Sequence, residues 1–199
     1  MDTVFEGFPK IARLNRECII TEKIDGTNSS VVIDETGLVI RAGSKSRWIT
    51  PTDDNFGFAK WVDENRAALL TLGPGRHFGE WWGSKIQRKY GLQNEKRFSL
   101  FNTSRWVKQT DWASPPLLEK QQYVPACCHV VPVLYEGLFT TSAVTDCIQF
   151  LRNYGSCAAP GFMKPEGVVI FHTHGNYFFK ATLDHDEVPK SLVDKQGKV

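Results

Sequence analysis

Residues 21–28 read Thr-Glu-Lys-Ile-Asp-Gly-Thr-Asn, and the rest of the chain is organised around them. Apolar residues 18–20 lead into this stretch and β-branched residues 31–33 lead out of it. The sequence therefore predicts a strand, a turn and a second strand. Gly26 permits a backbone conformation closed to other residues, or the close approach of a ligand. A lone lysine on a strand is usually a solvated surface residue, but beside an acidic residue and an Asp-Gly turn Lys23 is a candidate covalent nucleophile.

The length and composition are those of one soluble domain. The chain has 199 residues, of which 41% are hydrophobic and 23% charged, so we expect a single domain over residues 1–199. No stretch approaches the roughly 20 apolar residues that cross a bilayer, and the N-terminus lacks a signal pattern. The formal net charge is +2, so any nucleic-acid footprint must be a local patch.

The cysteines indicate a reducing compartment. There are five, one pair is adjacent, and no Cys-x-x-Cys spacing occurs, so we expect free and mostly buried thiols. The stretch Cys127-Cys128-His129 suggests zinc, but it lacks a partner pair at ligand spacing. The alternative is that these residues begin an apolar strand.

Strand and helix patterns alternate along the chain. We expect strands at 18–23, 29–34, 38–42, 77–82, 98–103, 130–135, 168–173 and 177–182. Helical spacing runs from 58 to 72 and from 143 to 154. Residues 53–55 and Ser142 are the expected N-caps, and glycines follow the last residue of each helix. Phe5, Phe8, Ile11 and Leu14 are expected to cover one edge of the core, and residues 104–125 to form a polar surface excursion. The order predicts an α+β domain with mainly antiparallel sheets flanked by helices.

Four later stretches each place a charged or aromatic residue within or beside a predicted strand. Glu80 lies in Phe-Gly-Glu-Trp-Trp-Gly at 78–83, and Phe101 ends the alternating stretch Phe-Ser-Leu-Phe at 98–101. Glu166 lies in Pro-Glu-Gly at 165–167, and Lys180 lies in Phe-Phe-Lys-Ala-Thr at 178–182. Taken alone, each has an ordinary explanation as a strand residue that faces either solvent or the core.

Taken in order, these five stretches resemble the motifs of covalent nucleotidyltransferases, which include polynucleotide ligases and mRNA capping enzymes. The Lys-x-Asp-Gly pattern at 23–26 resembles the first motif. The string 22–28, together with Gly83, Ile86, Gln87 and Tyr90, is similar to RNA ligases of the RNA ligase 2-like type. The resemblance covers residues 21–182 and implies a nucleotidyltransferase (ATP-grasp-like adenylation) fold without a separate C-terminal domain. Such minimal ligases are frequent in bacteriophages and bacteria, which implies the cytoplasm of a bacterial cell or phage-infected host.

The resemblance also implies roles for individual residues. Lys23 would attack ATP, Asp25 would orient it, and Glu166 would act through Mg²⁺ or Mn²⁺. Lys180 would contact the α-phosphate, Glu80 would bind the ribose, and Phe101, with Phe98 as second candidate, would stack on adenine. The implied nucleotide-binding set is Glu22, Ile24, Gly26, Asn28, Lys45, Arg47, Glu80, Phe101 and Lys180. Asp25 has a plainer alternative, which is to cap the turn after the strand.

The implied reaction is ATP-dependent joining of a 3′-hydroxyl to a 5′-phosphate on RNA. It would pass through lysyl-AMP and an adenylylated 5′-end. Only neutral lysine is nucleophilic, and its reference pKa is about 10.4. A bound metal and cationic neighbours such as Lys180 would therefore be needed to lower the pKa of Lys23.

Two positions depart from the family pattern. The arginine expected after the second hairpin strand is replaced by Lys45, with Arg47 two residues on, and lysine cannot make the planar bidentate contact of arginine. The second lysine of the fifth motif is Thr182. A DNA nick ligase, a GTP-using capping enzyme, or a weakened domain that binds nucleotides or nucleic-acid ends therefore remain alternatives.

A cluster of basic residues offers a further site for RNA. These residues either hold substrate phosphates or form a solvated loop, and the sequence does not separate the two interpretations. They are Lys85, Arg88, Lys89, Arg105 and Lys108.

Overall fold

Two antiparallel-rich sheets form the framework of the molecule. The computed structural model describes residues 6–108, 121–184 and 186. Sheet A contains, in spatial order, β10 (Val133–Leu138), β1 (Glu17–Lys23), β11 (Gly167–His172) and β12 (Tyr177–Thr182). Sheet B contains β4 (Trp48–Ile49), β3 (Ile40–Ser44), β2 (Thr27–Ile33), β5 (Gly75–Gly83), β6 (Lys96–Leu100) and β9 (Cys128–Val130). Within these sheets β9 pairs parallel with β6 and the other neighbours are antiparallel.

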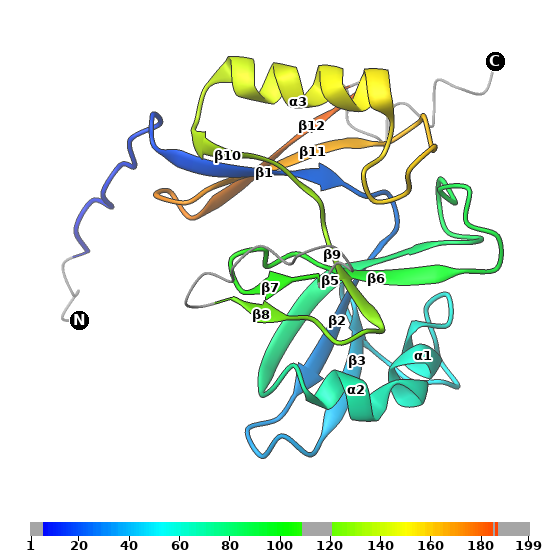
Figure 1. The fold of residues 1–199 in the computed structure, drawn as a ribbon. Coiled ribbons are helices and arrows are strands. Elements are labelled where there is room, and N and C mark those ends of the chain that lie inside the picture. The colour runs from blue at the N-terminus through cyan, green and yellow to red at the C-terminus, as the bar shows by residue number, and fades with distance from the viewer. Residues whose placement is uncertain (1–5, 109–120, 185, 187–199) are drawn as a thin grey trace.

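Helices cover the outer faces of both sheets (Figure 1). The helix α3 (Thr141–Tyr154) lies over sheet A, and α1 (Phe58–Glu64) and α2 (Arg66–Leu70) lie against sheet B. Each interface is a separate apolar core, because alternate strand residues point toward the helices. The expected α+β architecture with mainly antiparallel sheets is confirmed.

A third apolar cluster joins the two sheets where the chain passes between them. One passage runs from β1 to β2 and another from β9 to β10. The cluster consists of the buried residues Ile24, Trp82, Tyr90, Val131 and Ala159. Beside it, the N–H of Glu22 in sheet A donates to the carbonyl of Pro132 at 2.9 Å. The turn that follows Lys23 therefore starts from a packed junction.

The expected helix over 58–72 is two helices, because the chain breaks at Asn65 (φ −107°). The residue before α1 is Gly57, with φ 81°, and the carboxylate of Asp54 accepts the N–H of Ala59 at 2.8 Å. At α3 the cap is Thr140, whose hydroxyl accepts the N–H of Ala143 at 3.1 Å, so the expected cap at Ser142 was two residues late.

Two other expectations were wrong, and that for residues 104–125 was incomplete. The single strand expected at 130–135 is split between β9 and β10, which lie in different sheets, and Pro132 stands at the crossing. The excursion at 104–125 includes the short parallel pair β7 (Trp106–Val107) and β8 (Gln122–Tyr123), and its residues 109–120 lie outside the described part. Phe8 and Ile11 are 86% and 78% exposed, so they do not cover the core, and Phe5 is not described.

The cysteines are all free thiols. Cys18, Cys128 and Cys147 are buried, and Cys128 begins β9. Among the described residues, no cluster of three potential metal ligands accompanies the 127–129 stretch. None of the described helices is long and apolar enough to cross a membrane.

Candidate active site

Lys23 ends β1 and forms an ion pair with Glu166, which directly precedes β11. The Lys23 Nζ lies 2.5 Å from Glu166 Oε2, and the two side chains are 24% and 5% exposed. The pairing follows from the sheet register, because Lys23 lies opposite Gly167. A Cβ on Gly167 would collide with the carbonyl oxygen of Ala181, so glycine lets β12 pack close beside this pair. Sequence positions 143 residues apart thus meet at one point.

Glu80 reaches the same point from sheet B. Its Oε1 accepts the N–H of Gly26 at 3.1 Å. Burial raises the pKa of Glu80 to about 7, although the nearby charge of Lys23 acts to lower it, and the carboxylates of Glu166 and Asp25 add to the increase. One ammonium group and three carboxyl groups therefore interact at the junction of the two sheets.

Asp25 is fixed by the segment that follows β5. The Nε of Arg88 lies 3.1 Å from Asp25 Oδ2, and the backbone N–H of Asp25 donates to the Tyr90 hydroxyl at 2.8 Å. Arg88 also donates to the carbonyl of Lys164 at 3.0 Å, close in sequence to Glu166. Arg88 consequently links the turn after β1 to the segment before β11.

Gly26 is required by close packing. Its φ is not in the left-handed region, so backbone freedom is not the reason for glycine here. A Cβ at this position would collide with the carbonyl oxygen of Trp81 and lie 2.7 Å from the Cβ of Trp82. The close approach that requires glycine here is made by strand β5, whereas the expected reasons were an unusual backbone conformation or the approach of a ligand.

The fifth-motif residues share the face of sheet A that carries Lys23. Lys23, Gly167 and Thr182 form one register row, and Lys180 lies opposite Val169 two rows along, on the same face. The hydroxyl of Thr182 donates to the carbonyl of Asp184 at 3.0 Å, so it is engaged by the chain that follows β12. Lys180 is exposed and adds a second positive charge to the face of sheet A that carries Lys23.

The predicted base-stacking residue lies on the face of sheet B that carries Glu80. Phe101 follows β6, is 37% exposed, and its N–H donates to the carbonyl of Phe78 at 3.0 Å. Phe98 is fully buried in the core on the opposite face. Asn28 lies directly opposite Glu80, so its side chain shares the same face.

Lys45 and Arg47 differ in their surroundings. Arg47, in the turn before β4, pairs at 2.5 Å with Asp53, which follows β4. Lys45 is exposed and directly follows Ser44, the last residue of β3, which lies opposite Ser29, the neighbour of Asn28 on β2. Lys45 is the better placed of the two for a contact near Glu80.

Glu22 and Ile24 point into the protein. Glu22 is 1% exposed, and it accepts hydrogen bonds from the Ser156 hydroxyl at 2.5 Å and the N–H groups of Cys157 and Ala158 at 2.8 and 2.9 Å. Burial raises the pKa of Glu22, and these three donors oppose the shift. Their positions favour a structural role for both residues rather than nucleotide contact by their side chains. No pattern in the sequence indicated that the 156–158 loop would be the partner of Glu22.

The five basic residues do not act alike. Arg105 donates to the carbonyl of Leu72 at 2.9 Å and packs on Trp106, and Lys108 donates to the carbonyl of Cys128 at 2.7 Å. With Arg88 held by Asp25, three of the five stabilise the fold. Lys85 and Lys89 are exposed.

A family model described as RNA ligase matches residues 16–182 of the chain. The chain belongs to the RNA ligase family. The matched range contains all five stretches around Lys23, Glu80, Phe101, Glu166 and Lys180, so the resemblance to this family is confirmed.

Solved RNA ligase structures share the fold. A lysine-to-alanine variant of Naegleria gruberi RNA ligase with ATP and Mn is 16% identical, with a TM-score of 0.56 over 93% of this chain and 52% of that one. An aspartate-to-alanine variant of the same ligase, without ligand, is 16% identical, with a TM-score of 0.57 over 94% and 53%. This chain thus spans about half the length of the structures it matches. No curated protein sequence matches it.

The donor set of this RNA ligase family member suits a hard cation. The carboxylates of Glu166, Glu80 and Asp25 offer oxygen ligands, which Mg²⁺ and Mn²⁺ prefer. Among the described residues, no three His, Cys, Asp or Glu side chains are arranged to hold a metal ion by themselves. Mg²⁺ is commonly held by one or two carboxylates together with substrate phosphates, so the residues present fit an ion that arrives with a nucleotide.

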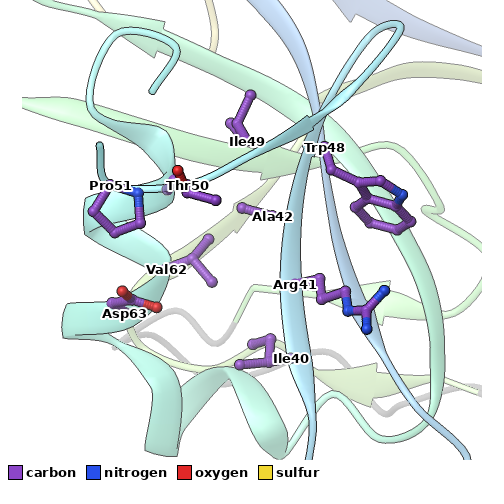
Figure 2. A pocket seen from close by; sticks show the side chains of 10 residues that line it. Ile40, Arg41, Ala42, Trp48, Ile49, Thr50, Pro51, Val62 and Asp63 are labelled. Carbon is purple, nitrogen blue, oxygen red and sulfur yellow. The ribbon is translucent and has the colours of Figure 1, made fainter. Parts of the chain in front are cut away.

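A surface pocket lies away from these groups. It measures about 370 Å³ and lies between the β3–β4 hairpin and α1 (Figure 2). Ile40, Ala42, Ile49 and Val62 line its apolar side, and no residue of the Lys23 cluster borders it. The candidate active site of this RNA ligase family member is therefore the junction around Lys23.

Proposed function

We propose that this chain is an ATP-dependent RNA ligase that joins a 3′-hydroxyl to a 5′-phosphate. The observation that carries the proposal is the meeting of Lys23 with Glu166, Glu80 and Asp25 at the junction of the two sheets. Family membership supports the same reaction class. End joining of this kind suits RNA repair in a bacterial or phage-infected cell.

Lys23 is the proposed nucleophile. Its Nζ must lose a proton and leave Glu166 before its lone pair can bond to the α-phosphorus of ATP, as the bond to pyrophosphate breaks. The AMP group then passes from Lys23 to the 5′-phosphate of RNA, and the 3′-hydroxyl displaces AMP. A Mg²⁺ or Mn²⁺ ion at Glu166 would neutralise phosphate charge and offset the carboxylate.

The neighbouring side chains have distinct proposed roles. Asp25, held by Arg88, orients Lys23, and exposed Lys180 faces the α-phosphate from the same side of sheet A. Glu80 binds the ribose hydroxyls.

The remaining nucleotide contacts come from sheet B and the turn before it. Phe101 stacks on adenine, which is worth about 1–3 kcal/mol for a base on an aromatic ring. Asn28 and the Gly26 backbone flank Glu80, and Lys45 faces the outer phosphates, with Arg47 as the alternative.

The test is RNA joining by the purified chain. A 5′-phosphorylated RNA and a 3′-hydroxyl RNA are incubated with Mg²⁺ and either ATP or GTP, and products are separated on a denaturing gel. We expect a joined product with ATP that is absent in Lys23→Ala and retained in Lys60→Ala, whose side chain lies on the exposed surface of α1.

The other outcomes separate the alternatives. Joining of nicked DNA in preference to RNA would identify a DNA ligase, and a covalent GMP adduct a capping-type enzyme. Nucleotide binding without any covalent adduct would overturn the proposal and leave a binding domain.

A further inference from the structure

Four side chains form a continuous row on the face of sheet B that carries Glu80. The guanidinium carbon of Arg76 lies 5.7 Å from the ring centroids of both Trp48 and Phe78, and that of Arg41 lies 5.9 Å from the Trp48 ring. In Figure 2 the side chains of Trp48 and Arg41 lie on the opposite side of β3 from the side chain of Val62. The row therefore alternates cation and aromatic ring across strands β3, β4 and β5.

The strand register accounts for this arrangement. Arg41 and Arg76 both lie opposite Val32, on either side of β2. Trp48 lies opposite Gly43, where an added Cβ would stand 2.7 Å from the Ser30 hydroxyl and 3.7 Å from the indole ring. The small residues of β2 and β3 thus leave room for the indole to lie over the sheet.

The rings of Trp48 and Phe78 are exposed to solvent and are not part of the apolar core. Trp48 and Phe78 are each 48% exposed, whereas their strand neighbours Ile49 and His77 are 5% and 4% exposed. Exposed aromatic rings interleaved with arginine are suited to nucleic acid. Bases stack on the rings, and a stacked guanidinium keeps its N–H groups free for phosphate oxygens.

Among the described residues, the two arginines have no carboxylate partner of the kind that neutralises other arginines of the chain. Arg47, Arg88 and Arg97 each pair with a carboxylate. Within the part of the chain that the structure describes, neither arginine has a carboxylate partner; Arg41 lies over the Trp48 ring, and Arg76 lies over the rings of Trp48 and Phe78. Their positive charge is therefore available to an anionic ligand.

The row leads directly to the candidate active site. Phe78 and Glu80 are two residues apart on β5 and point to the same face, about 7 Å apart along the strand. Phe101 lies beside Phe78. A strand of RNA lying on the row would pass from Arg41 toward the position where Lys23 and Glu80 meet.

We propose that the Arg41–Trp48–Arg76–Phe78 row binds a single-stranded segment of the RNA substrate next to the end that is joined. The inference rests on the proposed function for its choice of RNA as the ligand. Unstacked bases match the rings, and paired bases do not expose their faces, so the single strand is the expected form.

The experiment measures RNA binding without ATP, which separates it from the joining reaction. The probe is a fluorescently labelled 3′-hydroxyl oligouridylate, titrated by anisotropy at several salt concentrations, with duplex RNA of equal length as a second arm. The variants are Trp48→Ala, Trp48→Phe and the double variant Arg41→Ala/Arg76→Ala. The controls are Tyr154→Ala, which removes an exposed ring on α3, and Lys60→Ala, which removes an exposed charge on α1.

We expect Trp48→Ala to weaken binding of the single strand about tenfold or more, and Trp48→Phe to restore most of it. The double arginine variant should reduce the slope of log affinity against log salt by about 1.4, since each phosphate contact on a single strand contributes about 0.7. The controls should bind as the unmodified chain does.

Equal affinity of Trp48→Ala and the unmodified chain, or tighter binding of duplex than of single strand, would overturn the inference. Formation of the covalent AMP adduct is assayed in parallel and does not need RNA. A chain that binds RNA through this row but forms no adduct would refute the proposed function and leave the RNA surface standing.

Discussion

Replacement of Glu80 by glutamine should change the pH dependence of stability in a calculable way. The pKa of Glu80 rises from 4.5 to about 7 on folding, chiefly because of burial. Between these values the folded protein binds more protons than the unfolded one, so the free energy of unfolding falls as the pH rises through this window. A shift of this size corresponds to a penalty of up to about 3 kcal/mol, fully present above about pH 7.

Glutamine carries no charge and still accepts the N–H of Gly26 through its side-chain oxygen. The free energy of unfolding is measured by urea denaturation from about pH 4, below the unfolded pKa, to about pH 8. We expect Glu80→Gln to match the unmodified chain at the acid end and to exceed its stability by up to about 3 kcal/mol at the alkaline end. Glu35→Gln, in the exposed hairpin loop, is the control and should change the profile little. Parallel profiles for Glu80→Gln and the unmodified chain would refute the reasoning.

Three further substitutions test the junction. Gly26→Ala should destabilise the fold by about 1–3 kcal/mol or more in urea denaturation, because the methyl group meets backbone of β5, and unchanged stability would contradict the packing. Arg88→Ala should slow AMP adduct formation about tenfold by releasing Asp25, with partial rescue by Arg88→Lys, and an unchanged single-turnover rate would remove Arg88 as a positioning residue. Ser156→Ala should lower the free energy of unfolding by about 1.5–3 kcal/mol, because Glu22 loses a hydrogen bond to its carboxylate; a stability equal to that of the unmodified chain would show that the bond contributes nothing.

Local patterns predicted much of the fold. The strands that end at Lys23 and begin at Val168 were expected close to their observed bounds, because β-branched runs end at turn residues there. The break of the first helical segment at Asn65 and the division of the 130–135 strand were missed. The division falls at Pro132, which lacks the N–H that a continuous strand would donate, so a local signal for it was present. The helical periodicity does not record the break at Asn65.

The candidate site was predictable in its members but not in its contacts. Strand alternation alone places Glu22 and Lys23 on opposite faces, so the burial of Glu22 was accessible from the sequence. The pairing of Arg88 with Asp25 could not be predicted from the sequence, because 63 residues separate them and a turn region with left-handed residues brings them together. The row around Trp48 likewise exists only once the four neighbouring strands β4, β3, β2 and β5 are in register.

The most direct test of the account is to locate the covalent adduct. The purified chain is incubated with ATP and Mg²⁺, denatured, digested and examined by tandem mass spectrometry, alongside Lys23→Arg and the matched control Lys60→Arg. The account predicts one AMP group on Lys23 in the unmodified chain and in Lys60→Arg, and none in Lys23→Arg. An adduct on any other residue, or one that persists in Lys23→Arg, would contradict it.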